Sequence, residues 1–197
     1  MWMNTLAGMY VTLVPTICAG IFNMIWCKSG CLSAWAKPLD GGRLFRDGKR
    51  IFGDNKTWKG LLGYLVLNAL FMVLWGPACR SLGIEHANFF YTHHANVFSF
   101  NLGVGLLLGL AYALFELPNS FLKRRIAIEP GKTASGARKI AFVFLDQADS
   151  IFGCALVVWL FYPLGLPLYL LYVLVGAFTH ILLNLALYLC GLRKNPI

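Results

Sequence analysis

The chain has 197 residues, of which 58% are apolar and only 13% are charged. Soluble domains rarely have such a composition, so it indicates a protein with several membrane spans. The six cysteines form no Cys-x-x-Cys motif, so a metal site built on Cys27 and Cys31 is only weakly indicated, and packing or interfacial roles are favoured.

Five apolar segments are each near the roughly 20 residues that a helical membrane span requires. No positive residue precedes the first segment, and it is too long for the apolar region of a signal peptide, so we expect it to remain as a membrane helix. The segments indicate an all-α integral membrane protein in which residues 1–197 form a single domain. The spans are predicted at residues 6–26, 58–79, 97–117, 140–162 and 166–190.

The basic residues lie almost entirely in alternate loops. Of 17 Lys and Arg residues, 16 fall within 28–59, 123–139 and the C-terminal tail, where Arg193 and Lys194 lie. The positive-inside rule therefore predicts an outer N-terminus, a cytoplasmic C-terminus and two cytoplasmic loops. Because the net charge of +9 gathers at one membrane face, we expect anionic solutes and membrane lipids, rather than nucleic acid, as partners.

The first cytoplasmic loop ends in a polar element just before the second span. Asn55 or Thr57 is placed to cap that helix, and free backbone N–H groups at a helix start bind phosphate. Lys56 and Lys59 would add positive charge to such a site. The alternative is that both lysines only mark the cytoplasmic side and that Trp58 anchors the interface. No Walker A motif is complete, which excludes a P-loop ATPase.

The second cytoplasmic loop follows the third span. If that helix continues past Pro118, then Glu116, Asn119, Ser120 and Lys123 share one face at its cytoplasmic end. A break at Pro118 would instead separate these groups. The basic run that begins at Lys123 is otherwise explained as a topology signal.

Asp146 and Asp149 lie within the apolar fourth span. Their spacing places both carboxylates on one helix face, where a single bare charge at bilayer depth costs roughly 3 kcal/mol. A divalent metal or a basic cluster must neutralise them. A carboxylate pair that holds Mg²⁺ beside lysines and arginines suits nucleotidyl or phosphoryl transfer, so we expect Mg²⁺ as the cofactor.

Four stretches resemble the CDP-archaeol synthase family, in the same order along the chain. They are Pro38-x-Asp40-Gly-Gly, Asp47-Gly-x-Arg50-x-x-Gly53-x-x-Lys56-Thr57-Trp58-x-Gly60, Ser120-x-x-Lys123-Arg124 and Asp146-Gln-x-Asp149. The resemblance implies a CTP-dependent cytidylyltransferase that acts on a glycerol-phosphate lipid and releases pyrophosphate. The lipid would be of the archaeal dialkyl or the bacterial diacyl type, and the sequence leaves both open.

The resemblance also implies roles for individual residues. Asp146 and Asp149 would hold the metal, with Glu116 as a further ligand, and Lys123 would join the two aspartates in catalysis. The charge topology predicts an active site on the cytoplasmic side of a multi-pass protein of the cell membrane, and the resemblance allows a homodimer. The residues expected to contact substrate or nucleotide are Asp54, Asn55, Lys56, Thr57, Lys59, Asn119, Ser120 and Arg124.

The alternative function is a small cation transporter or channel that uses Asp146 and Asp149 as an ion site. A transport path would need polar groups through the whole span. The outer half of the fourth span, residues 155–162, carries no charge, which favours a site open to one side only.

Overall fold

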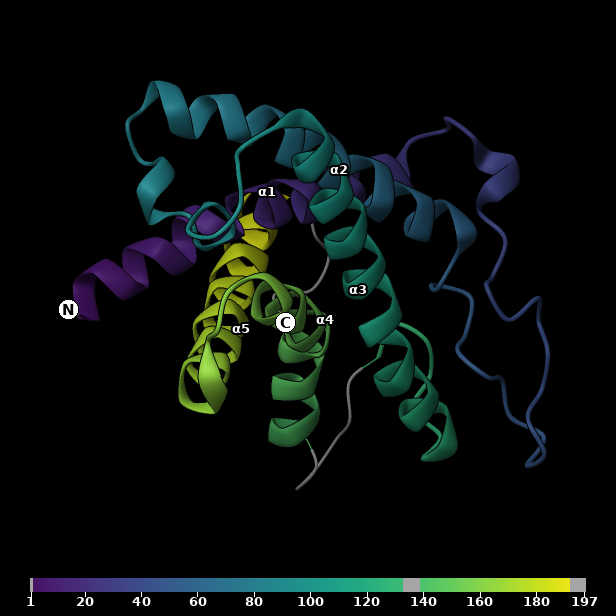
Figure 1. The fold of residues 1–197 in the computed structure, drawn as a ribbon. Coiled ribbons are helices and arrows are strands. Elements are labelled where there is room, and N and C mark those ends of the chain that lie inside the picture. The colour runs from purple at the N-terminus through teal and green to yellow at the C-terminus, as the bar shows by residue number, and fades with distance from the viewer. Residues whose placement is uncertain (1, 133–138, 192–197) are drawn as a thin grey trace.

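The computed structural model describes residues 2–132 and 139–191, and within them every regular element is a helix. Each long helix there is long and apolar enough to cross a membrane, which confirms the predicted all-α membrane architecture. Arg193 and Lys194, which the charge pattern assigned to the cytoplasmic side, lie outside the described residues. The long helices are α1 (Trp2–Lys28), α2 (Trp58–Ser81), α3 (Phe98–Arg125), α4 (Lys139–Phe161) and α5 (Gly165–Leu189) (Figure 1).

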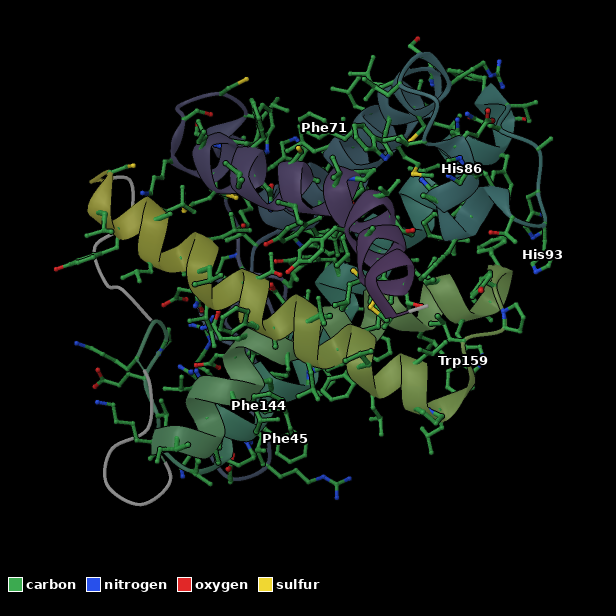
Figure 2. The ribbon with its side chains drawn as sticks, turned by 90° about the vertical axis from the view of Figure 1, so that its left-hand side faces the viewer. Phe45, Phe71, His86, His93, Phe144 and Trp159 are labelled. Carbon is green, nitrogen blue, oxygen red and sulfur yellow. The ribbon has the colours of Figure 1, made fainter. Side chains whose placement is uncertain are left out.

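The loops carry short 3-10 helices at the two ends of the molecule. η1 (Ser33–Trp35) lies in the first loop, while η2 (Glu85–Ala87) and η3 (Phe89–Tyr91) lie between α2 and α3. Figure 2 shows Phe45 of the first loop and Phe144, near the start of α4, both toward the bottom of the view, whereas His86 and His93 lie higher and on the other side. The basic first loop and the α3–α4 end of the bundle thus share one side of the molecule.

The helix α3 passes through Pro118 and ends at Arg125, so the alternative of a break at the proline is wrong. Proline removes one backbone N–H, but the hydrogen bonds of the flanking turns carry the helix across it. The helix therefore extends well beyond the predicted span end at residue 117. The end of α3 thus presents Glu116, Asn119 and Lys123 on successive turns at the end of the bundle where the first loop lies.

The helices pack closely where glycines leave room for a neighbour. A Cβ atom at Gly105 would lie 2.6 Å from the Cα atom of Ala69, and one at Gly109 would lie 2.4 Å from the carbonyl oxygen of Tyr64. These two glycines bring α2 and α3 into backbone contact along one seam. The pairs α3–α4, α1–α2 and α4–α5 also pack side by side. The α2–α3–α4 unit thus forms a fixed frame for the polar groups at its end.

Candidate active site

A polar cluster joins the ends of α3 and α4. The side-chain amide of Asn119 donates hydrogen bonds to Asp146 Oδ1 at 2.8 Å and to Asp149 Oδ2 at 2.9 Å. Lys123, one turn further along α3, places Nζ 2.5 Å from Asp146 Oδ2. The two carboxylates therefore converge on one point, and a lysine neutralises one of them.

A second ion pair ties the first loop to the same face of α3. Lys56 forms a salt bridge with Glu116, and both side chains are largely buried. Burial alone would lower the pKa of Lys56, but the charge and hydrogen bond of Glu116 raise the pKa above its ordinary value. Asp149 and Asp146 raise the same pKa further, which places Lys56 within electrostatic range of the aspartate pair.

A cavity of about 400 Å³ opens beside this ion pair. Lys56 and Glu116 line it together with Asn55 and Thr57 of the first loop, and Tyr64 of α2 lies at its inner wall. The cavity is bounded by α1, α2, α3 and the loop. It provides a polar chamber at the membrane end where the basic residues gather.

The predicted substrate residues of the first loop have different positions. Thr57 is the N-cap of α2, with its hydroxyl accepting from the N–H of Gly60 at 3.1 Å, so the predicted cap is confirmed. Asn55 lines the 400 Å³ cavity beside Lys56. Asp54 is exposed and pairs with Arg50, with 2.7 Å between Oδ1 and Nη1.

Lys59 contacts the end of α1. Its ammonium donates to the carbonyl oxygen of Ser29 at 2.6 Å and lies over the ring of Trp26, 5.2 Å from the centroid. Lysine near the last carbonyls of a helix stabilises that helix end. The structure therefore does not bring Lys59 together with the other predicted substrate contacts, and it explains Lys59 as a support for the end of α1.

Asp40 organises the first loop. Its buried carboxylate accepts from Arg50 Nη2 at 2.7 Å and from the backbone N–H groups of Gly42, Phe52 and Gly53 at 3.0, 2.9 and 3.1 Å. Burial alone would raise the pKa of Asp40, but these donors hold the pKa well below its usual range. Asp40 appeared in the family-like stretches of the sequence without an assigned role.

Arg124 lies beneath this loop as a buried cation. It is 7% exposed, and among the described residues its Nε and Nη1 atoms have no hydrogen-bond partner. Gly53, with φ of +111°, lies against it, because an added Cβ would stand 3.5 Å from Arg124 Nη1 and 2.9 Å from Pro130 Cγ. Buried guanidinium nitrogens without a partner are costly, so Arg124 is suited to receive an anion such as a phosphate. Ser120, one turn before it on α3, is also buried.

Arg125 fastens the loop to the end of α3, a role that the sequence did not reveal. Its guanidinium pairs with Asp47 at 2.5 Å and stacks on the rings of Phe45 and Phe121, with centroids 4.9 and 4.7 Å away. Lys49 returns the contact by donating to the carbonyl oxygen of Arg125 at 2.8 Å. The adjacent arginines Arg124 and Arg125 thus have different roles, one suited to bind an anion and one holding the loop. Nothing in a run of basic residues distinguishes these roles in the sequence.

The donor set at the aspartate pair suits a hard divalent cation only in part. Among the described residues, no three His, Cys, Asp or Glu side chains are grouped to hold a metal ion. Asp146 and Asp149 converge, but the predicted third ligand, Glu116, pairs with Lys56 instead. The amide oxygen of Asn119 is buried and has no hydrogen-bond partner among the described residues, so it offers a further oxygen beside Asp146 and Asp149. Two carboxylates and an amide oxygen are the donor types that Mg²⁺ takes.

Relatives of this chain are found by sequence. The family model described as CarS-like, CDP-archaeol synthase, matches residues 6–197. A CDP-archaeol synthase of Thermofilum pendens is 32% identical over 160 residues, which cover 81% of this chain and 65% of that relative's length. A CDP-archaeol synthase of Methanoculleus marisnigri is 30% identical over 177 residues, which cover 86% of this chain and 95% of the relative.

A solved structure described as an intramembrane enzyme for archaeal membrane lipids biosynthesis has a similar fold. The TM-score is 0.58 at 22% identity, and the match covers 89% of this chain and 91% of that one. At this identity the likeness concerns the fold alone. The family model spans nearly the whole chain, and the Methanoculleus relative is matched over nearly its full length. On these matches, the chain belongs to the CDP-archaeol synthase family.

Proposed function

We propose that the protein transfers CMP from CTP to the phosphate of a membrane glycerol-phosphate lipid, giving a CDP-lipid and pyrophosphate. The observation that carries the proposal is the convergence of Asp146 and Asp149 on Asn119 beside Lys123. This cluster lies between a basic loop and the membrane-spanning helices, where a soluble nucleotide and a lipid phosphate can meet. Family membership supports the same reaction.

In the proposed reaction an oxygen of the lipid phosphate attacks the α-phosphorus of CTP. The bond from that phosphorus to the bridging oxygen breaks, and the electron pair leaves with pyrophosphate. Arg124 and Lys56 would bind the phosphate oxygens. Two buried guanidinium nitrogens of Arg124 have no partner among the described residues, and Lys56 lines the polar cavity. Lys123 would hold Asp146 ionised and oriented. No covalent intermediate on the protein is needed.

Asp146 and Asp149 would hold Mg²⁺, with Asn119 as the nearest further oxygen donor. When bound, the ion would offset negative charge on the phosphate oxygens and fix their geometry. Glu116 would contribute through Lys56, whose ammonium it orients. Ser120, Thr57, Asn55 and Asp54 would supply hydrogen bonds or shape the loop around the nucleotide.

The lipid is proposed to be a dialkyl glycerol phosphate, because the relatives are CDP-archaeol synthases. The active site would face the cytoplasm from the cell membrane, since the basic loops lie at its end of the bundle. A homodimer remains a prediction, which the mass of the protein in detergent would check. A cation transporter is disfavoured, because α4 beyond Asp149 continues with Ile151, Cys154 and Val158, all buried and apolar.

A product assay tests the proposal. Protein purified in detergent is given labelled CTP and Mg²⁺ with either a dialkyl or a diacyl glycerol phosphate. We expect a labelled CDP-lipid and pyrophosphate in equal amounts, with the dialkyl lipid preferred. Preference for the diacyl lipid would correct the lipid type. Absence of any CDP-lipid, together with cation flux in proteoliposomes lacking CTP, would overturn the proposal in favour of transport.

A further inference from the structure

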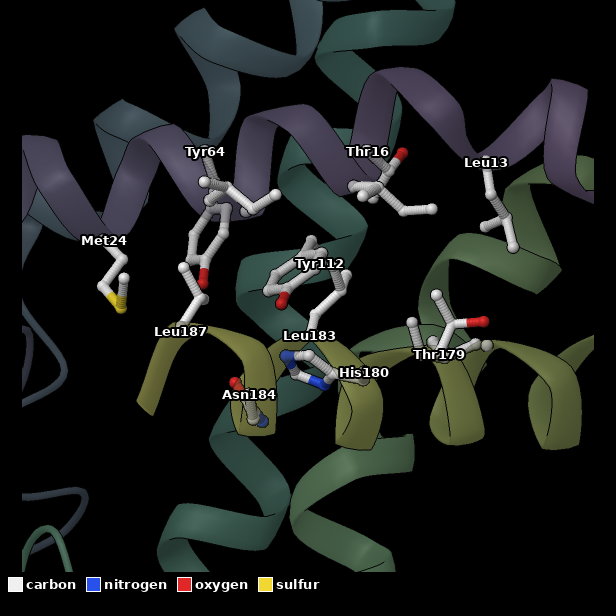
Figure 3. A pocket seen from close by; sticks show the side chains of 15 residues that line it. Leu13, Thr16, Met24, Tyr64, Tyr112, Thr179, His180, Leu183, Asn184 and Leu187 are labelled. Atoms are coloured by element: carbon white, nitrogen blue, oxygen red, sulfur yellow. The ribbon is translucent and has the colours of Figure 1, made fainter. Parts of the chain in front are cut away.

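A second cavity, of about 190 Å³, lies within the membrane-spanning part between α1 and α5 (Figure 3). Its walls are one face of each helix, with lining residues recurring every three or four positions. On α1 these include Leu13, Ile17 and Gly20, and on α5 they include Gly176, Leu183 and Leu187. The lining is mainly apolar, so this cavity differs in character from the polar one.

The helices α1 and α5 are tied together at one end of this cavity. Tyr10 and Thr179 share a hydrogen bond of 3.1 Å, and Tyr172 donates to the carbonyl oxygen of Met9 at 3.3 Å. Both bonds involve the N-terminal half of α1. The cavity extends from there along α1 to Met24, toward the end of the bundle that carries the basic loop.

The apolar cavity adjoins the polar cavity at a pair of tyrosines. Met24 and Tyr64 line both cavities. The ring of Tyr64 stacks on that of Tyr112, with centroids 4.1 Å apart, and both hydroxyls point toward α5 (Figure 3). Tyr112 is one helical turn before Glu116 on α3, about 6 Å along the axis. The polar groups of the active site and the apolar cavity thus meet over a short distance.

The wall of the cavity is also fixed to the helix that carries the aspartates. Asn184 donates to the side chain of Gln147 at 2.6 Å, and His180 Nδ1 lies 3.2 Å from the backbone oxygen of Gln147. Gln147 directly follows Asp146 in α4. A ligand seated against this part of α5 is therefore held in register with the aspartate pair.

We propose that this cavity binds the part of one hydrocarbon chain that lies next to the glycerol of the lipid phosphate. The inference rests on the proposed function. Apolar cavities of about 150 Å³ stay dry and take up hydrocarbon, so this one would take roughly seven carbons. The rest of the chain would extend into the bilayer. The lipid phosphate would then lie on the polar side of the tyrosine pair, near Lys56 and the aspartates.

Gly20 offers a direct test, because its Cβ would point into the cavity. An added Cβ there meets only the hydroxyl of Tyr112, at 3.8 Å, so Gly20→Leu fills the space without a backbone clash. Gly103→Leu is the matched control, since Gly103 is exposed on α3 and an added Cβ meets nothing within 4 Å. Each variant is assayed with a long-chain dialkyl glycerol phosphate and with the dimethyl ether of glycerol phosphate, whose chains are too short to fill the cavity.

We expect Gly20→Leu to lower kcat/KM for the long-chain lipid by about tenfold or more and to leave the dimethyl ether unaffected. Gly103→Leu should change neither. Equal use of the long-chain lipid by Gly20→Leu and the unaltered protein would overturn the proposal. A general folding defect in Gly20→Leu would lower kcat/KM equally for both substrates. In that case a binding measurement on the unaltered protein decides whether the cavity holds the lipid chain.

That measurement uses a lipid phosphate with a photoreactive group on a chain carbon near the glycerol. Cross-links should map to the lining residues of α1 and α5, and Gly103→Leu should keep them. Cross-links confined to exposed Leu102 and Leu106 of α3 would overturn the site. Cavity cross-links without CDP-lipid formation would contradict the proposed function alone. CDP-lipid formation with cross-links elsewhere would contradict the cavity alone.

Discussion

The ammonium of Lys123 lies 2.5 Å from a carboxylate oxygen of Asp146, and the two side chains are only 10% and 20% exposed. This ion pair supplies part of the neutralisation that carboxylates in an apolar helix require. Removing one partner of such a pair leaves an uncompensated buried charge, which destabilises a protein more than the pair itself stabilises it. The charge balance of the site therefore depends on the relative position of α3 and α4, which keeps Lys123 beside Asp146.

Replacing Lys123 should impair both activity and stability. In Lys123→Met we expect CDP-lipid formation to fall by about 100-fold, because a charge that orients the site is lost. The melting temperature should also fall, since Asp146 is left unpaired. Lys139→Met, at the exposed start of α4, is the control and should behave like the unaltered protein. Normal activity in Lys123→Met would contradict the role given to this lysine.

The adjacent arginines should respond in opposite ways. Arg124→Leu removes a buried guanidinium with unpaired atoms, so CTP binding should weaken by about tenfold or more while stability without CTP is kept or improved. Arg125→Leu removes the clamp on Asp47 and the two phenylalanine rings, so the melting temperature should fall. CTP titration and thermal unfolding are measured on both. A stability loss in Arg124→Leu with unchanged CTP binding would refute the assignment.

Asp40 should confer stability that depends on pH. Its folded-state pKa is below the unfolded value of about 4, so its ionised form stabilises the fold above that pH. This stabilisation is lost as the pH falls below about 4 toward the folded-state pKa. Asp40→Asn should therefore lower the melting temperature near neutral pH, and the difference should narrow in acid. Asp54→Asn, at an exposed position, is the control. A difference that does not change with pH would argue against this account.

The two lysines around the α2 cap should separate binding from structure. Lys56→Met should lower kcat/KM for CTP, because Lys56 lines the polar cavity and pairs with Glu116. Lys59→Met should lower the melting temperature and leave the KM for CTP unchanged, because Lys59 supports the end of α1. Steady-state kinetics on both variants decide the matter. A raised KM for CTP in Lys59→Met would restore Lys59 to the substrate contacts.

Much of the fold could be predicted from the sequence, because a helix that crosses a membrane requires a long run of apolar residues. Apolar runs near 20 residues placed the five helices to within a few residues at most ends. The exception was α3, where hydropathy ends near residue 117 but the helix continues through Pro118 to Arg125. The polar face of that extension carries Asn119 and Lys123. The predicted helix end was therefore wrong at the part of α3 that belongs to the candidate active site.

The sequence predicted which residues belong to the candidate active site, but it predicted only some of the contacts between them. Helical spacing alone placed Asp146 with Asp149 and Asn119 with Lys123, since both are local relations. Contacts between distant segments had no such signal. The pairing of Glu116 with Lys56 and the turn of Lys59 toward α1 both depend on how the first loop folds over the bundle. That path is set by Asp40, which holds the loop together from within, and by Arg125, whose partner Asp47 is 78 residues away along the chain.

The central claim is that Asp146 and Asp149 form the catalytic centre of a cytidylyltransferase. It is tested most directly by the rate of pyrophosphate release from CTP, with lipid phosphate and Mg²⁺ present, in Asp149→Asn and in the unaltered protein. The account predicts lipid-dependent release in the unaltered protein, abolished by a chelator, and a loss of about 100-fold or more in Asp149→Asn. An undiminished rate in Asp149→Asn would contradict it.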